Sequence, residues 1–312
     1  MIKVRGLEKR YGSTWALRGL NFDVPKGSIY GFIGENGAGK TTTLRILAGL
    51  LAPDAGTAVV AGYDVVQNPR PVKQRMGYMP DFFGVYDDLK VTEYLEFYAE
   101  ASGLFRAKAQ RLRDEVLDLV GLSDKGNVHV DSLSRGMKQR LCLARALMHD
   151  PEVLLLDEPA SGLDPLARVE MRELMKKLGK MGKTILISSH ILSELADLCT
   201  HVGIIKQGVM VAQGTVEEVL QKGLRRELSI RFLDEDTQKV AEVLSARPEV
   251  HSVSTDGLRV EVEIEGGPEK GAALLEFLIQ AGYRVTSFAD TTSSLEDTYL
   301  RLAGGGGEGE ED

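Results

Sequence analysis

The first part of the chain alternates between short apolar runs and helical patterns. Ser28–Ile33, Val153–Leu156 and Thr184–Ser188 each have the length and composition of a strand buried in a parallel sheet. A helix is predicted between the first run and a turn at Pro53–Gly56, from the helical spacing of Leu44, Leu47, Ala48 and Leu51. Strands that alternate with helices predict an α/β domain with a doubly wound parallel sheet.

The stretch from about Val91 to His149 has a different pattern. Apolar positions recur at helical spacing in Leu112–Val120 and again in Met137–Met148. No strong strand pattern separates these two segments. We therefore expect a helical insert, at about residues 84–150, within the α/β core.

A second domain is predicted from residue 223 to residue 303. Its expected elements are, in order, a strand at Ile230–Phe232, a helix at Val240–Leu244, a hairpin turn at Asp256–Gly257, an alternating strand at Leu258–Ile264, a helix at Leu274–Ile279 and a strand at Val285–Phe288. The order βαββαβ predicts a small α+β, ferredoxin-like sandwich. A last helix is expected at Leu295–Leu302, and the glycine- and glutamate-rich tail, 304–312, is expected to be disordered.

Composition narrows the class of protein. The 312 residues are 43% hydrophobic and 27% charged, as in ordinary soluble proteins, and the net charge of -8 disfavours non-specific binding to nucleic acid or anionic lipid. Cys142 and Cys199 lack a CxxC setting, so we expect two reduced, buried thiols in a reducing compartment. No secretory signal opens the sequence, and no segment has the roughly 18–20 apolar residues of a membrane-spanning helix.

The strongest chemical signal is a glycine-rich loop between a predicted strand and a predicted helix. The pattern GxxxxGK[ST] is formed by Gly34, Glu35, Asn36, Gly37, Ala38, Gly39, Lys40 and Thr41, and is followed by Thr42. Its glycines let successive N–H groups face one anion, and the helix N-terminus adds its dipole. Lys40 can reach the β- and γ-phosphates of a nucleotide, and Thr41 offers a hydroxyl to Mg²⁺.

Two carboxylates follow the apolar run Val153–Leu156. Asp157 and Glu158 are expected at the carboxyl edge of the sheet, where ligands bind in open α/β folds. Asp157 would hold Mg²⁺ through water, and Glu158 would orient or deprotonate an attacking water molecule.

A further segment distinguishes among the nucleotide-binding classes. Leu133–Met137 resembles the LSGGQ signature of ABC ATPases, with Ser134 and Gly136 retained and with Arg135 and Met137 in place of glycine and glutamine. Ser134 is also a good N-cap for the helix that follows. The resemblance covers roughly Met1–Gln221 and implies a P-loop NTPase (RecA-like) cassette, over residues 1–222, that binds ATP and Mg²⁺. It also implies that the signature contacts the ATP held by the opposite subunit.

Other motifs match this family in the same order. Ser161, Gly162, Leu163 and Asp164 resemble the D-loop, which links the two sites of a dimer. His190 resembles the switch histidine that contacts the γ-phosphate. Tyr11 resembles the aromatic residue that stacks on adenine. Asp81 stands where the family usually has glutamine, and a carboxylate there can still bind Mg²⁺ or position water.

The resemblance also implies partners. One set of motifs contains half of each composite site, so we expect a dimer with a second copy or a close relative. The aromatic segment Phe82–Tyr86 is expected either to dock a multi-span membrane permease or to pack under the helical insert. Ser294–Leu300 resembles the closing segment of exporter ATPases, which implies export of an unidentified substrate from the inner face of the cell membrane. A generic dimer-stabilising appendage is the alternative for this second domain.

Two other functions compete with transport. A non-transport ABC ATPase acting on ribosomes or DNA is disfavoured, because the chain has one cassette, no sustained heptads and an acidic balance, so no nucleic-acid partner is expected. A P-loop metabolic kinase is disfavoured by the signature and by Ser161–Asp164.

Overall fold

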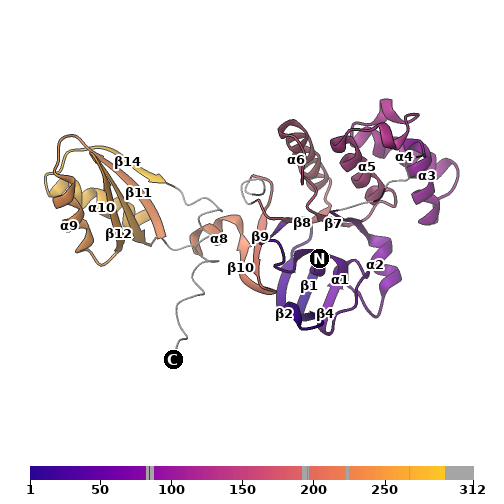
Figure 1. Ribbon diagram of the computed structural model, residues 1–312, viewed down its shortest axis with the longest axis horizontal. Helices are drawn as coiled ribbons and strands as arrows, with labels where there is room; N and C mark the ends of the chain where they lie inside the picture. Colours follow the sequence, from indigo (N-terminus) through magenta and orange to yellow (C-terminus); the bar gives the residue numbers. More distant parts are fainter. Residues whose placement is uncertain are drawn as a thin grey trace. The chain divides into compact units, whose positions relative to one another are not determined.

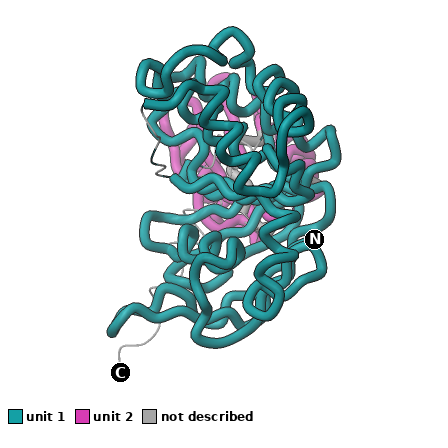
Figure 2. The backbone as a smooth tube through the Cα atoms, turned by 90° about the vertical axis from the view of Figure 1, so that its right-hand side faces the viewer, with its two compact units in different colours: residues 1–216 teal, residues 217–312 magenta. Residues whose placement is uncertain are grey.

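The computed structural model describes residues 1–81, 84, 88–191, 195, 197–222, 225–266 and 268–291. The chain divides into two compact units, residues 1–216 and 217–312 (Figure 2). Each unit has a hydrophobic core of its own. Among the described residues, every helix is too short or too polar to span a lipid bilayer.

The first unit contains two sheets (Figure 1). One has the order β2-β1-β4-β5 and is antiparallel, with β1 (Ile2–Tyr11), β2 (Thr14–Val24), β4 (Ala55–Val60) and β5 (Tyr63–Asp64). The other has the order β10-β9-β3-β8-β7-β6, with β3 (Ile29–Ile33), β6 (Met76–Met79), β7 (Val153–Asp157), β8 (Thr184–Ser189), β9 (His201–Lys206) and β10 (Val209–Thr215). All of its strands run parallel except β10, which confirms the predicted parallel sheet.

The helices of this unit connect the strands. They are α1 (Lys40–Leu47), α2 (Pro69–Arg75), α3 (Val91–Ala101), α4 (Ala107–Leu119), α5 (Arg135–Leu147) and α6 (Pro165–Lys180), with short 3₁₀ helices η1 (Ser123–Lys125) and η2 (Val130–Ser132). Helix α8 (Val216–Lys222) begins where the unit ends. Helices α3, α4 and α5 fill the stretch 91–149, so the predicted helical content of this segment is confirmed.

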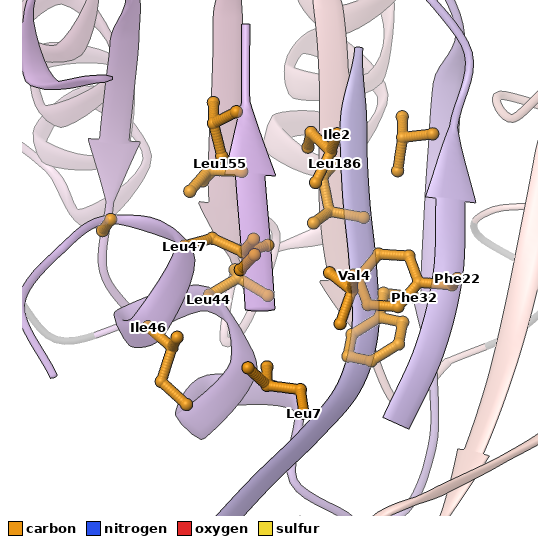
Figure 3. Close-up of a cluster of buried hydrophobic side chains, with 14 of the residues drawn as sticks. Ile2, Val4, Leu7, Phe22, Phe32, Leu44, Ile46, Leu47, Leu155 and Leu186 are labelled. Carbon is orange, nitrogen blue, oxygen red and sulfur yellow. The ribbon is translucent and has the colours of Figure 1, made fainter. Parts of the chain in front are cut away.

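One core joins the two sheets through α1. Phe22 of β2 stacks on Phe32 of β3 with the ring centroids 5.2 Å apart (Figure 3). Leu44 and Leu47 of α1 are fully buried in the same cluster. Each such side chain contributes roughly 1.5–3 kcal/mol by its burial. The strand before the glycine-rich loop and the helix after it are therefore both anchored in this core.

Helix α1 ends earlier than the sequence pattern predicts. Gly49 has φ +64°, and its N–H and that of Leu50 donate to the carbonyls of Ile46 and Arg45. This pair of hydrogen bonds closes a helix at a left-handed glycine. The prediction that the turn at Pro53–Gly56 ends this helix was therefore wrong. The last two residues of that segment already belong to β4.

The helical segment is tied to the parallel sheet through His149, two residues after the end of α5. Its Nε2–H donates to the carbonyl oxygen of Met76 at 3.1 Å, and burial lowers the pKa of the imidazole below its ordinary value. The folded state therefore resists protonation of His149 more than the unfolded chain does. Stability that is present above about pH 6.5 is lost as the pH falls below that value.

The corresponding prediction concerns His149→Gln, which keeps an N–H donor for Met76. Denaturant unfolding at about pH 7 and about pH 5.5 should show a smaller loss of unfolding free energy in the variant than in the wild type, because only the wild type takes up a proton at this site on unfolding. Equal losses in the two proteins would contradict this role.

Both cysteines are free and buried, as predicted. Burial raises the pKa of the Cys142 thiol to about 11 and also raises the pKa of Cys199. Both are therefore protonated, unreactive thiols at neutral pH.

The second unit has one antiparallel sheet with the order β12-β13-β11-β14. Its elements are β11 (Arg225–Phe232), α9 (Thr237–Ser245), β12 (Val250–Asp256), β13 (Arg259–Glu265), α10 (Pro268–Gln280) and β14 (Val285–Thr291). Residues of both helices pack with Ile230, Val260 and Val262 in one core. The predicted order βαββαβ is confirmed, and the assignment to the ferredoxin-like class stays a prediction.

Some predictions are left open. Along the chain, the boundary between the two units falls between Val216 and Glu217. The predicted domain ranges, 1–222, about 84–150 and 223–303, stay predictions, because compactness alone does not define independently folding domains. The helix expected at 295–302, the segment 294–300 and the tail 304–312 lie outside the described residues, as do the aromatic side chains of Phe82, Phe83 and Tyr86.

Candidate functional site

The glycine-rich loop leaves β3 and enters α1 with a backbone that requires glycine. Gly37 and Gly39 have φ values of +84° and +110°. A Cβ at Gly39 would lie 2.6 Å from the carbonyl oxygen of Ala16, and one at Gly34 would overlap the carbonyl oxygen of Ile205. Glycine at these positions therefore permits both the left-handed turns and the close approach of neighbouring backbone.

Lys40, the first residue of α1, curls back over this loop. Its ammonium group donates to the carbonyl oxygens of Gly34 at 2.6 Å and Glu35 at 3.1 Å. The residue is only 5% exposed. Its Nζ also lies 3.5 Å from Oε1 of Glu158. A buried positive charge is thus held at the centre of the loop by two carbonyls and one carboxylate.

Glu158 follows β7 in a strained conformation. Its φ is +50°, which is uncommon for a residue with a side chain and costs conformational energy. Its backbone N–H donates to Oγ of Ser188 at 3.0 Å. The carboxylate lies between Lys40 and His190, whose Nδ1 is 2.9 Å from Oε2. The result is a compact set of one acid and two basic groups.

Asp157, the last residue of β7, immediately precedes Glu158 and is fully buried. Its Oδ1 accepts hydrogen bonds from the hydroxyls of Thr41 at 3.2 Å and Ser188 at 2.6 Å. Among the described residues no donor reaches its Oδ2, although that oxygen is buried. A buried carboxylate oxygen without a partner usually indicates an ion or water that completes its contacts.

These oxygens fit Mg²⁺. In the described part of the chain, no three His, Cys, Asp or Glu side chains form a cage for a metal. Mg²⁺ in phosphoryl-transfer sites is typically held by one or two carboxylates, a hydroxyl, water and the substrate's phosphates. Thr41 and Asp157 match that donor set.

A cavity of about 430 Å³ opens above the loop. Most of the residues predicted for the site line it together: Tyr11, Asn36, Gly37, Gly39, Lys40, Thr41, Thr42, Asp81, Glu158, Ser161 and His190. Tyr11, at the end of β1, is 48% exposed, and Asp81 follows β6. An exposed aromatic ring at one side and a cationic loop at the other suit a ligand with a flat base and a charged tail.

The predicted signature residues, Ser134, Arg135, Gly136 and Met137, are absent from the described lining of this cavity and begin α5 instead. Ser134 is the N-cap of α5, as predicted, and its Oγ accepts from the N–H of Met137 at 3.3 Å. A Cβ at Gly136 would lie 3.1 Å from Cβ of Ala167, so this glycine lets α5 and α6 approach closely.

The predicted D-loop connects Glu158 to α6. The N–H of Ser161 donates to the carbonyl oxygen of Glu158 at 3.0 Å. Gly162 has φ +65°, and Leu163 is buried. Asp164 caps α6 by accepting from the N–H of Ala167 at 3.0 Å. The loop is therefore a structured link that starts at the acid of the site.

Sequence reasoning missed two residues of the site. Ser188 bridges Asp157 and the N–H of Glu158, and Ala16 lines the cavity beside the loop. The signal for Ser188 was present, since this serine follows the apolar run Ile185–Ile187, in the strand next to the one that ends in Asp157. Nothing in the local pattern around Ala16 distinguishes it from an ordinary strand residue.

Comparison with known proteins gives consistent matches. The family model described as ABC transporter matches residues 17–161, and that of the C-terminal domain of DrrA1-3-like ATP-binding proteins matches residues 214–303. The chain is 38% identical over 309 residues to the bacitracin transport ATP-binding protein BcrA of Bacillus licheniformis, and the match covers 98% of each chain. It is also 38% identical over 303 residues to the Nod factor export ATP-binding protein I of Burkholderia orbicola, covering 97% of each.

A solved structure agrees with these relatives. An ATP-binding subunit of an ABC transporter superimposes with a TM-score of 0.65 at 31% identity, covering 71% of this chain and 92% of that one. The resemblance seen in the motifs is thus confirmed, and neither the kinase nor the ribosome- or DNA-associated alternative is favoured. The chain belongs to the ABC transporter family of ATP-binding proteins and is an ATPase subunit of that family.

Proposed function

We propose that this chain drives export through a separate membrane permease, by closing on a second ATPase subunit with ATP bound and reopening after hydrolysis. The observation that carries the proposal is the Glu158 carboxylate held between Lys40 and His190 at the wall of the loop cavity. The transport role is supported by the relatives named for bacitracin transport and Nod factor export, which match nearly the whole chain, and the direction of transport is supported by the second of them.

ATP would bind with its base on Tyr11 and its phosphates in the glycine-rich loop. Backbone N–H groups of the glycine-rich loop and the N-terminus of α1 offer donors to the anion, although those of Gly34 and Ala38 already donate to the carbonyls of Ser189 and Glu35. Lys40 would exchange the carbonyls of Gly34 and Glu35 for the β- and γ-phosphates, since phosphate is a stronger acceptor for an ammonium group than a carbonyl.

Mg²⁺ would be held by the hydroxyl of Thr41 and, through water, by Asp157. Asp81 also lines the cavity and could supply a further carboxylate ligand. When bound, it would neutralise charge on the β- and γ-phosphates. Ser188 would keep the Asp157 carboxylate oriented, because its hydroxyl donates to Oδ1.

Hydrolysis would follow once Lys40 has turned to the phosphates. Glu158 then loses its lysine neighbour, and its carboxylate can accept a proton from a water molecule facing the γ-phosphate. His190 would contact the γ-phosphate and keep Glu158 in place through the 2.9 Å contact. The strained backbone at Glu158 aims this side chain into the cavity.

Each site would be completed by the other subunit. The N-terminus of α5, with Ser134 as its cap and Arg135, Gly136 and Met137 in its first turn, offers donors that its own cavity does not use. We infer that it binds the γ-phosphate held by a second copy or a close relative. The pair would work at the cytoplasmic face of the membrane, attached through a multi-span permease.

Mixing two inactive variants tests this shared site. Lys40→Met disables the loop of one subunit, and Ser134→Arg blocks its signature helix. Each variant alone should show little turnover. In an equal mixture, about half of the dimers should contain one copy of each variant. Each mixed dimer has one intact site, because the loop of one subunit meets the helix of the other, so part of the turnover should return.

Two equal mixtures of wild type with either variant provide the matched controls. A mixture of the two variants that stays as inactive as each alone would contradict the shared site. Co-purification tests the transport role separately: a multi-span membrane protein is the expected partner, whereas ribosomes or DNA would contradict export.

A further inference from the structure

Arg135 occupies a position where helix electrostatics disfavour it. It is the first residue of α5, directly after the N-cap Ser134. The N-terminal end of a helix carries a partial positive charge, so a guanidinium group there is unfavourable for the helix itself. The residue is exposed and is not needed for the core. The presence of an arginine at this position must therefore be explained by the contacts of its side chain.

The Arg135 side chain reaches the D-loop of its own chain. Its Nη2 donates to the carbonyl oxygen of Ser161 at 3.2 Å. The guanidinium lies over Gly162 so closely that a Cβ at that glycine would overlap it. Gly162 also has φ +65°. A hydrogen bond and a close packing contact of the same guanidinium thus join the start of α5 to this loop.

The same loop is held from its other side by α6. Nε of Arg168 donates to the carbonyl oxygen of Leu163 at 3.0 Å. The N–H of Ser161 donates to the carbonyl oxygen of Glu158 at 3.0 Å. A continuous path therefore runs from Arg135 through Ser161 to the backbone of Glu158, and Ser161 and Glu158 both line the loop cavity.

We propose that Arg135 is a positioning residue that fixes the D-loop of its own chain on the first turn of α5. The D-loop thereby couples the position of the α5 N-terminus, which contacts the nucleotide of the other subunit, to the position of the Glu158 carboxylate in the same chain. Nucleotide binding at one site therefore orients the catalytic carboxylate of the other site. The proposal rests on the shared-site function above. In it, Arg135 acts within one chain and does not bind the second subunit's phosphate.

A double-mutant cycle tests the contact. Arg135→Gly removes the guanidinium, Gly162→Ala pushes it away, and the double variant contains both changes. We expect Arg135→Gly to lower kcat roughly tenfold while the KM for ATP changes less than about twofold, since a misplaced acid slows the chemical step. Gly162→Ala carries the strain of its positive φ in both backgrounds, so its cost in kcat should be at least about threefold larger in the wild-type background than in Arg135→Gly.

Two further variants serve as controls. Arg135→Lys, which keeps a donor for the Ser161 carbonyl, should recover part of the lost kcat. Lys138→Ala removes a neighbouring positive charge on α5 and should leave kcat near the wild-type value. Hydrogen exchange of the backbone over residues 159–165 should be faster in Arg135→Gly, which provides a readout independent of turnover.

Other results would overturn the proposal. If the two substitutions multiply independently, or if exchange over 159–165 is unchanged, Arg135 does not hold the loop. If Arg135→Gly raises KM and spares kcat, the side chain binds nucleotide instead. Wild-type turnover that is independent of dimerisation would refute the shared site itself. In that case the double-mutant cycle and the hydrogen-exchange data would still test the contact between Arg135 and the D-loop, because that contact lies within one chain.

Discussion

The Glu158→Gln variant is expected to bind ATP with near wild-type affinity and to hydrolyse it at least about a hundredfold more slowly. Glutamine has the same shape, so the strained backbone and the cavity persist, but it cannot accept a proton from water. With ATP uncleaved, the two subunits should stay closed. Phosphate release under saturating ATP and size-exclusion chromatography with ATP present measure the two effects.

Glu152→Gln is the matched control for this variant. Glu152 immediately precedes β7, at the end opposite Glu158, and its carboxylate lies 3.6 Å from Arg75 on the surface. The same chemical change there should leave turnover within about twofold of the wild type, as expected for an exposed ion pair. Turnover near the wild-type rate in Glu158→Gln would refute the catalytic role given to Glu158.

Replacement of Lys40 by methionine should weaken ATP binding by roughly a hundredfold. Methionine fills much of the same space, but the phosphates lose a buried cation and Glu158 loses the partner 3.5 Å away. Removal of one member of a buried charge pair costs about 3 kcal/mol, which corresponds to about two orders of magnitude in affinity. Titration with a fluorescent ATP analogue measures the dissociation constant.

Lys183→Met is the comparison for this change. Lys183 pairs with Asp150 at 2.6 Å, and neither residue lines the loop cavity. Its affinity for nucleotide should match that of the wild type. An affinity loss below about threefold in Lys40→Met would show that the loop holds nucleotide through its backbone alone, contrary to the role proposed for this lysine.

Short-range patterns predicted most of the segments that line the loop cavity. The glycine-rich loop is read from consecutive residues, and its φ values of +84° and +110° are those that only glycine adopts readily. Asp157 and Glu158 could be placed beside it because strands of a parallel sheet end at a common edge. The cavity brings these segments together with Tyr11, Asp81 and His190.

Long-range register limited what the sequence could predict. Ser188 lies opposite Asp157 because β7 and β8 pair in that register. No local sequence pattern predicts the register in which two strands pair. The antiparallel sheet around β1 and β2 was not predicted, since its strands contain several bulges that interrupt their alternation. The contact between Arg135 and Gly162 depends on the approach of α5 to α6, which also has no local signature.

The most direct test of the shared site is the ATP turnover rate per subunit as a function of protein concentration. We predict that the rate rises with concentration and saturates in step with the dimer fraction measured by analytical ultracentrifugation under the same conditions. A rate per subunit that stays constant down to concentrations at which only monomer is present would contradict the account.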